Sequence, residues 1–176
     1  MLDQIKKYSP LLFVAGLVVV LDQSTKWFVR TNIPLNGSWL PESLLWLSPY
    51  ARLVFIYNQG AAFGMFQNGN LIFTMLAFLV LGGILYYYSQ IESSDRLMRL
   101  SIGLYLGGVL GNLIDRLAMG KVTDFISVGN FYIFNVADAA INVGVVVLLT
   151  AFWLNDRRKA GMTSETEVLS TSGEAS

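Results

Sequence analysis

Four long apolar segments run through this chain and constrain its fold more than any other feature. They cover residues 11–29, 70–88, 97–117 and 136–154. A helix needs about 20 residues to cross the hydrocarbon core of a bilayer. The chain is 54% apolar and only 14% charged, whereas about a quarter of the residues in a soluble domain are charged. The sequence therefore predicts an all-α polytopic membrane protein with four transmembrane helices.

The first apolar segment has two possible interpretations. Lys6 and Lys7 precede it, as basic residues precede the apolar region of a cleavable signal peptide. No small-x-small cleavage site follows the segment. We therefore expect residues 11–29 to be retained as a membrane span.

The basic residues between the spans predict the orientation of the chain, because cytoplasmic loops are enriched in Lys and Arg. With four spans, three groups of basic residues fall on the same side of the membrane. They are Lys6 and Lys7, Arg96 and Arg99, and Arg157, Arg158 and Lys159. This side is predicted to be the cytoplasm, so both termini are predicted to be cytoplasmic. The opposite side also carries cations, which we expect to be held by buried partners: Lys26, Arg30, Arg52, Arg116 and Lys121.

The outer segment, residues 31–69, contains turn-forming residues and one run typical of a strand. Pro34, Asn36-Gly37, Pro41 and Pro49 break it up. The β-branched and aromatic residues in 52–57 predict a strand, and residues 131–134 are a second extended candidate. We expect a small sheet at the outer membrane surface.

The C-terminal end differs in composition from the rest. Residues 156–176 are rich in Ser, Thr, Glu and Gly and have no apolar period. This composition predicts a disordered cytoplasmic tail after a transmembrane domain of residues 1–155. Within the third span, Gly103, Gly107 and Gly111 recur every four residues, a pattern typical of close helix packing.

Composition excludes several kinds of chemistry. The chain has no cysteine and no histidine, which removes disulfides, Ser-His and Cys-His nucleophiles and nearly all zinc sites. Twelve Lys and Arg balance twelve Asp and Glu, so there is no basic excess to bind nucleic acid.

Four aspartates lie in or near the spans, toward the outer side: Asp22, Asp115, Asp124 and Asp138. An ionisable group within a span costs at least about 2.5 kcal/mol, so each needs a partner or a function. Asp22 and Lys26 are four residues apart and predict a local ion pair. Arg116 shares a helix face with Asn112, and its partner is a carboxylate or a substrate carbonyl.

Asp124 and Asp138 suggest a catalytic pair. Asp138 follows Asp124 by fourteen positions, and a strand and a tight turn between them could bring the two together. Two carboxyl groups close together share one proton, and one then activates water while the other protonates a carbonyl, as in aspartic proteases. The residues alone leave three alternatives open: an ion-pair network with Lys121 and Arg116, a proton-coupled transporter, and a non-catalytic scaffold.

Five ordered motifs show a family resemblance. They are Asp22-Gln-Ser-Thr-Lys26, Asn58-Gln-Gly-Ala-Ala-Phe-Gly64, Gly107-Gly-Val-Leu-Gly-Asn-Leu-Ile-Asp-Arg116, Val122-Thr-Asp-Phe-Ile126 and Phe134-Asn-Val-Ala-Asp-Ala-Ala-Ile141. In these motifs the sequence resembles the lipoprotein signal peptidases, also called signal peptidase II. Two features depart from the family pattern: Val109 stands where Ala is commoner, and the interval between the two aspartates is short.

The resemblance implies an aspartic endopeptidase of the bacterial inner membrane. It implies cleavage of diacylglyceryl-modified prolipoproteins before the lipidated cysteine, without metal or cofactor, by a monomer in contact with membrane lipid. It also implies four transmembrane helices with a small periplasmic β-sheet, a loop that acts as a lid, and a site near the periplasmic face.

The motif positions assign roles to residues of this chain. Asp124 and Asp138 fall on the catalytic positions. The polar positions that hold substrate fall on Asn58, Gly60, Asn112, Arg116 and Asn135. Asp22, Lys26 and Asp115 are expected to be structural supports.

Overall fold

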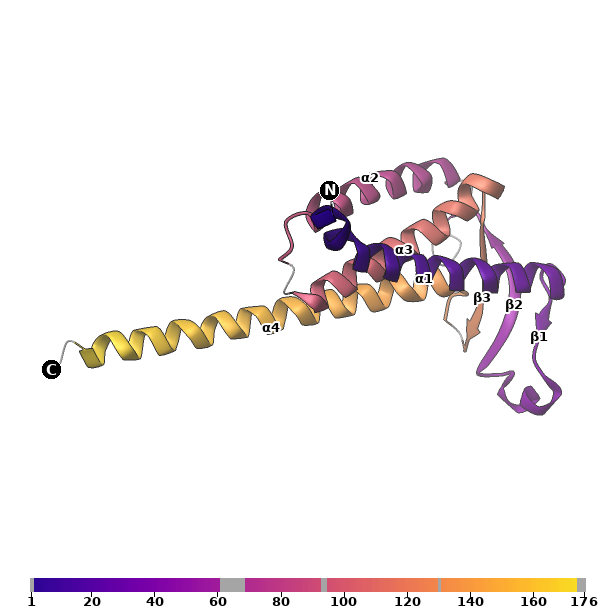
Figure 1. Ribbon diagram of the computed structural model, residues 1–176. Coiled ribbons are helices and arrows are strands. Elements are labelled where there is room, and N and C mark those ends of the chain that lie inside the picture. Colours follow the sequence, from indigo (N-terminus) through magenta and orange to yellow (C-terminus); the bar gives the residue numbers. More distant parts are fainter. Residues whose placement is uncertain (1, 61–68, 93–94, 130, 174–176) are drawn as a thin grey trace.

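Among the described residues, four α-helices and a small sheet form the structure (Figure 1). The computed structural model describes residues 2–60, 69–92, 95–129 and 131–173, with side chains between residues 7 and 157 of these ranges. The helices are α1 (Leu2–Asn32), α2 (Asn70–Tyr88), α3 (Arg96–Met119) and α4 (Val136–Gly173). Each contains one of the four predicted spans, so the helical part of the prediction is confirmed.

The outer surface of the helices is apolar. Only Ala77, Ile84 and Tyr88 are buried among the 19 residues of α2. Phe13 of α1 and Leu79 of α2 are 73% and 72% exposed. All four helices are long and apolar enough to cross a membrane. Such a surface suits a lipid environment, because exposed apolar area of this extent is rare on soluble proteins.

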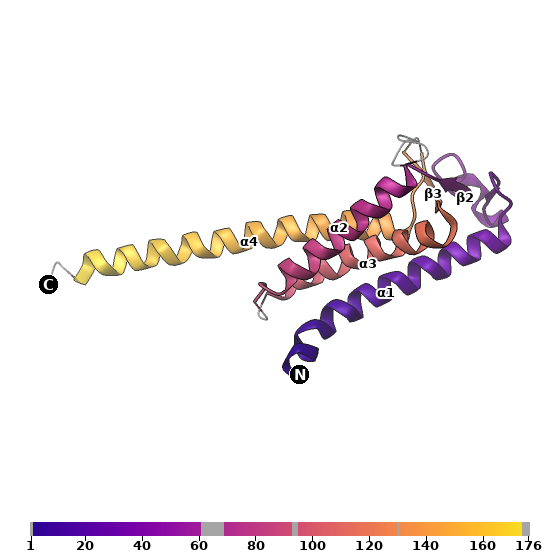
Figure 2. The same ribbon diagram turned by 90° about the horizontal axis from the view of Figure 1, so that it is seen from above.

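Helix α3 lies at the centre and packs against α1, α2 and α4 (Figure 2). The predicted glycine face is confirmed as a packing face. A Cβ on Gly107 would come within 2.6 Å of Val18 Cβ in α1, and a Cβ on Gly103 within 2.8 Å of Val14 Cβ. The glycines therefore allow α1 and α3 to approach closely.

The sheet has three antiparallel strands in the order β1-β2-β3. They are β1 (Ser38–Trp39), β2 (Ala51–Asn58) and β3 (Val122–Val128). A short 3-10 helix, η1 (Glu42–Leu47), connects β1 to β2. The apolar side chains of Phe55 and Phe125 pack on Val29 and Ile33, and this contact fixes the sheet on the end of α1.

The prediction for the sheet is correct at one strand and wrong at the other. Strand β2 contains the predicted residues 52–57. The second strand is β3, whereas residues 131–134 contribute only one bridge, between Phe134 and Ile126. The β-branched residues of β3 favour a strand, but Asp124 in its middle obscures the pattern. Residues 61–68 belong to the outer segment in which the lid-like loop is expected, and they lie outside the described residues.

Helix α4 continues to Gly173, where the sequence predicts a disordered tail from residue 156. The extension projects beyond the other helices (Figure 1). Its residues include several strong helix formers, such as Ala160, Met162 and Leu169, and no proline. Once a helix has formed, each added residue contributes one further backbone hydrogen bond, so the extension needs no apolar period.

Candidate active site

Polar side chains gather where the sheet meets the helix ends. Asp22 of α1, Asp115 of α3 and Asp124 of β3 are almost fully buried there, with 0%, 1% and 2% exposure. Asp138 lies in the first turn of α4 and is half-buried. The expectation that the four aspartates converge on one polar layer is confirmed by the hydrogen bonds that join their elements.

Asp138 is held by the start of its own helix. The Asn135 side-chain Oδ1 accepts a hydrogen bond from the Asp138 backbone N–H at 3.0 Å. In return, Asp138 Oδ2 accepts one from the Asn135 backbone N–H at 3.2 Å. This reciprocal pair has the form of a capping box. The positive end of the helix dipole also favours a negative charge on Asp138.

Asp124 is held by two side-chain amides. Asn58 of the neighbouring strand donates its Nδ2 to Asp124 Oδ2 at 3.0 Å, and Asn135 donates its Nδ2 to Oδ1 at 2.7 Å. Asn58 can reach Asp124 because it lies diagonally across the β2–β3 pair, two positions from Ile56, the partner of Asp124.

Two asparagines link the two acids. Asn112 Nδ2 donates to Asp138 Oδ1 at 2.8 Å, and Asn135 Nδ2 donates both to Asn112 Oδ1 at 3.1 Å and to Asp124. Asp124 and Asp138 border one cavity of about 120 Å³. The other residues lining it are Asn58, Gly60, Asn112, Arg116, Val122 and Tyr132. The structure thus brings all seven residues predicted to act in catalysis or substrate binding to one place.

The position of Asp124 changes its acidity. Burial, followed by the negative charge of Asp138, raises the pKa of Asp124 from 3.8 to about 7, against the opposing effect of the hydrogen bonds from Asn58 and Asn135. A carboxyl group with this pKa can hold or release a proton near neutral pH. This property is required of a general acid that works at neutral pH.

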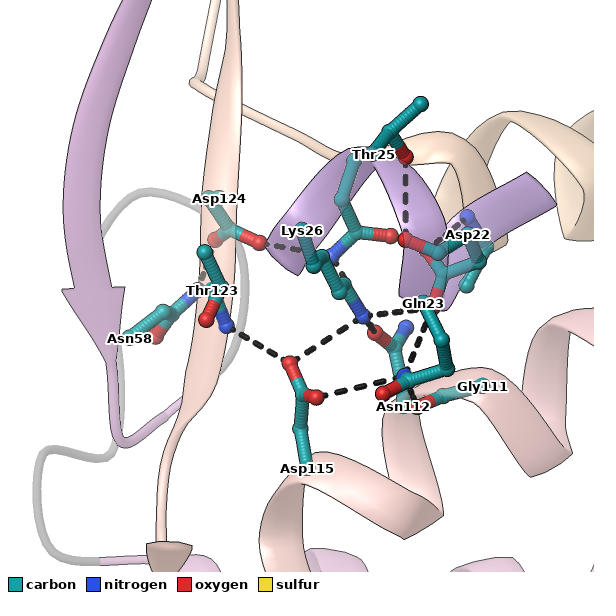
Figure 3. A network of polar contacts seen from close by, with 12 residues as sticks. Asp22, Gln23, Thr25, Lys26, Asn58, Gly111, Asn112, Asp115, Thr123 and Asp124 are labelled. Atoms are coloured by element: carbon teal, nitrogen blue, oxygen red, sulfur yellow. Dashed lines mark hydrogen bonds and ion pairs between the residues drawn. The ribbon is translucent and has the colours of Figure 1, made fainter. Parts of the chain in front are cut away.

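The predicted ion pair between Asp22 and Lys26 is confirmed, with a distance of 2.9 Å between Lys26 Nζ and Asp22 Oδ2. Lys26 also lies 3.2 Å from Asp115 Oδ2 (Figure 3). Two further side chains contact Asp115: Gln23, at 3.2 Å, and Arg30, at 3.5 Å. Arg30 thus has a buried partner, as expected for the outer cations, whereas the contact of Gln23 was not predicted. Contacts between separate helices leave no sequence signal, whereas a spacing of four within one helix does.

The other cations do not form the alternative ion-pair network. The Arg116 guanidinium lies over the Phe73 ring at 5.5 Å, and Lys121 Nζ lies over the Tyr57 ring at 3.6 Å. Within the part of the chain that the structure describes, neither cation forms an ion pair with Asp124 or Asp138. These two cations therefore make no direct ion pair with the acids at the cavity.

Two cavity residues were missed by the sequence analysis. Val122 belongs to the unpredicted strand β3, and Tyr132 lies in the connection between β3 and α4. An isolated tyrosine in a loop carries no signal of its own. Its position depends on the turn at Gly129, which has a φ of +52° and leads the chain back toward β3.

The fold and the site define a multi-pass membrane protein with a pair of acids in a polar cavity at one end of its helices. A family model described as signal peptidase (SPase) II matches residues 14–154. The chain therefore belongs to the signal peptidase II family, and it is a membrane-embedded enzyme of the aspartic peptidase type.

Curated relatives and a solved structure agree with this membership. A lipoprotein signal peptidase of Symbiobacterium thermophilum is 40% identical over 84% of this chain and 96% of its own length. A lipoprotein signal peptidase of Moorella thermoacetica is 42% identical over 79% of this chain and 89% of its own length. A bacterial membrane enzyme solved by the in meso method at 2.3 Å is 28% identical, with a TM-score of 0.75, over 85% of this chain and 90% of that one.

Proposed function

We propose that this enzyme removes signal peptides from diacylglyceryl-modified prolipoproteins and cleaves before the lipidated cysteine. The family supports the substrate class. The observation that carries the mechanism is that Asp124 and Asp138 border a single cavity. With no histidine or cysteine in the chain, an acid pair is the nucleophile-activating group that these residues offer.

The two acids take different roles in the proposed reaction. Asp138, at the N-terminus of α4, is the ionised base, because the helix dipole and its two hydrogen-bond donors favour the anion. Asp124 is the acid, because its pKa of about 7 lets it carry a proton at neutral pH.

The proton transfers balance over one turnover. Asp138 takes a proton from water as the water oxygen attacks the scissile carbonyl carbon, and Asp124 gives its proton to the carbonyl oxygen. Asp138 then passes its proton to the amide nitrogen while Asp124 recovers one from the resulting diol. The C–N bond breaks, and both acids return to their starting states.

The polar lining of the cavity positions the substrate in this proposal. Arg116 and Gly60 border the cavity beside the acids, and the guanidinium N–H groups of Arg116 and the backbone C=O of Gly60 are suited to an extended peptide backbone. Asn58 and Asn112 border the cavity as well, and together with Asn135 they hold the acids in place. An extended peptide needs such partners, because unpaired backbone groups are costly to bury.

The apolar spans support a membrane location, and the basic residues between the spans support cytoplasmic termini. In this proposal the enzyme lies in the inner membrane, with both termini in the cytoplasm and the cavity near the periplasmic face. The substrate's acyl chains then remain in the bilayer while the scissile bond enters the polar cavity. Because one chain supplies both acids, a monomer is sufficient for activity.

The test is an assay on a diacylated prolipoprotein with the variants Asp124→Asn and Asp138→Asn. Each variant should lose activity by about 10³-fold or more, because the acids act as a unit. The exposed Asp156, next to the far end of the spanning part of α4, provides the matched control, and Asp156→Asn should retain wild-type turnover. Full activity in either cavity variant, or strong inhibition by a chelator, would overturn the acid-pair mechanism.

A further inference from the structure

A buried lysine lies beside the acid pair but borders no part of the cavity. Lys26 is 0% exposed. Its Nζ lies 2.9 Å from Asp22, 3.2 Å from Asp115 and 3.0 Å from Asn112 Oδ1 (Figure 3). An ammonium group has three N–H donors, so these three acceptors use all of them. Every donor of Lys26 therefore connects to a different partner.

Each carboxylate partner of Lys26 holds the backbone next to one of the two acids. Asp115 Oδ2 accepts a hydrogen bond at 3.0 Å from the backbone N–H of Thr123, which precedes Asp124. Asp22 Oδ1 accepts one at 2.9 Å from the backbone N–H of Ala137, which precedes Asp138. Lys26 thus connects β3 and α4 through one carboxylate each.

The third partner, Asn112, depends on Lys26 for its orientation. Lys26 and Asn135 both donate to Asn112 Oδ1, so the amide nitrogen of Asn112 must point the other way. That nitrogen donates to Asp138 Oδ1 at 2.8 Å. A flipped amide would place N–H donors against the Lys26 ammonium, which is unfavourable in a buried site.

The charges around Lys26 are balanced. The carboxylates of Asp22 and Asp115 face the cations Lys26 and Arg30. A neutral group of four exerts little net charge on the nearby acids, which favours an effect through geometry over one through charge.

We propose that Lys26 is a positioning residue, which sets the distance between Asp124 and Asp138 and the amide orientation of Asn112 without contacting the substrate. The inference rests on the proposed roles of the two acids. Misplacement of catalytic groups by about 1 Å can cost about 10²-fold in rate. Loss of Lys26 should therefore lower kcat and leave KM nearly unchanged.

The first test compares Lys26→Met with Arg99→Met. Arg99 is also a nearly buried cation, but it lies at the opposite end of the helices, where it donates to Tyr88 Oη and the Lys7 carbonyl. Lys26→Met should lower kcat about 100-fold. It should also shift the basic limb of the pH profile upward, because a positive charge near Asp124 is lost. Arg99→Met should lower thermal stability without either effect.

A double variant separates orientation from charge and covers the case in which Lys26→Met fails to fold. Asp22→Asn with Lys26→Met removes one charge of each sign, and the new side-chain amide oxygen at position 22 can still accept from the Ala137 N–H. Replacing a buried ion pair by neutral groups is often tolerated. This double variant should fold, and the basic limb of its pH profile should stay at the wild-type position. Its kcat should still fall by about 100-fold.

The outcomes distinguish this inference from the proposed mechanism. Lys26 contributes only a structural ion pair if the double variant keeps wild-type kcat. The same follows if Lys26→Met, like Arg99→Met, lowers thermal stability without changing kcat or the pH profile. If Asp124→Asn and Asp138→Asn remain active in the same assay, the acid-pair mechanism fails first, whatever the result at Lys26.

Discussion

The three asparagines of the site act as oriented donors, because each has its carbonyl oxygen occupied. Asn58 Oδ1 accepts from the Gly60 backbone N–H at 2.9 Å, and Asn135 Oδ1 accepts from that of Asp138. Asn112 Oδ1 accepts from Lys26. The NH₂ groups are therefore directed at Asp124 and Asp138. A serine or aspartate at these positions could not reproduce this pattern, although either can cap a helix.

Asn135 has two separable roles, as the cap of α4 and as a donor to Asp124. Asn135→Ser should keep the cap, since Ser and Asn cap helices about equally well, but lose the donor at 2.7 Å. We expect kcat to fall about 10- to 100-fold with a small change in thermal stability.

Asp95 offers the matched control for this substitution. It caps α3 at the other end of the molecule by accepting from the Met98 N–H at 3.0 Å. Asp95→Ser should leave kcat within about two-fold of wild type. Equal losses of kcat in the two variants would show that capping alone explains the effect of Asn135.

The pH dependence of activity follows from the acidity of Asp124. Burial and the charge of Asp138 raise its pKa to about 7, and the proposed acid must carry a proton. Activity, measured as kcat/KM, should therefore fall as the pH rises through about 7. Asn58→Ala removes a hydrogen bond that lowers this pKa, so the basic limb should move to higher pH. A limb that moves to lower pH would contradict the assignment of Asp124 as the acid.

At the scale of elements, the sequence predicts the helices better than the sheet. A long apolar run is sufficient to predict a membrane helix, and α2 begins and ends at the predicted residues, 70 and 88. Strand β3 was missed because the polar Asp124 stands among its seven residues. The polarity that gives this strand its function also removes the pattern by which a strand is recognised.

The candidate site was predicted from sequence motifs more than from the spacing of residues along the helices. The spacing of Asp22 and Lys26 within one helix predicted their ion pair. The contacts of Lys26 with Asp115 and Asn112 join residues more than 80 positions apart. Such contacts depend on how α1 and α3 pack, which a sequence pattern does not specify. The backbone hydrogen bonds at Thr123 and Ala137 were unpredictable for the same reason.

The packing of α1 on α3 can be tested at a glycine. A methyl group on Gly107 would lie 2.6 Å from Val18 Cβ and 2.8 Å from the Ala15 carbonyl oxygen. Gly107→Ala should therefore destabilise the enzyme by about 1–3 kcal/mol and lower activity, since the polar site depends on this interface.

Gly82 in α2 is the matched control, because a Cβ there would have no neighbour within 4 Å. Gly82→Ala should be neutral or slightly stabilising, since Ala favours helix more than Gly does. The measurement is thermal unfolding in detergent together with turnover. Equal destabilisation by both substitutions would show that α1 and α3 are not closely packed.

At the scale of the whole molecule, the two ends of the helices differ. One end carries the sheet and the polar site, and both termini lie at the opposite end (Figure 1). There, Arg99 of α3 donates to Tyr88 of α2 and to the Lys7 carbonyl of α1, and Asn155 of α4 donates to Asp95. All four helices are thus joined by polar contacts at this end, and α1, α3 and α4 are joined by polar contacts at the sheet end as well, across an apolar middle.

Exposed tryptophans lie near both ends of the apolar region. Trp39 and Trp46 are 44% and 69% exposed near the sheet, and Trp153 is 54% exposed near the far end of the spanning part of α4. Tryptophan is enriched at both membrane–water interfaces. These positions support a molecule that spans the bilayer with the sheet at one surface and the termini beyond the other.

The orientation of this molecule can be measured directly, because the native chain has no cysteine. Ser43 in η1, between β1 and β2 of the sheet, is exposed. Asp156, next to the end of the spanning part of α4 at Arg157, is exposed as well. In intact spheroplasts, a membrane-impermeant maleimide should label Ser43→Cys and leave Asp156→Cys unlabelled. Permeabilised cells should show labelling of both, which controls for reactivity. Labelling of Asp156→Cys alone in spheroplasts would place the cavity on the cytoplasmic side, and the proposed route of the lipoprotein substrate would then be excluded.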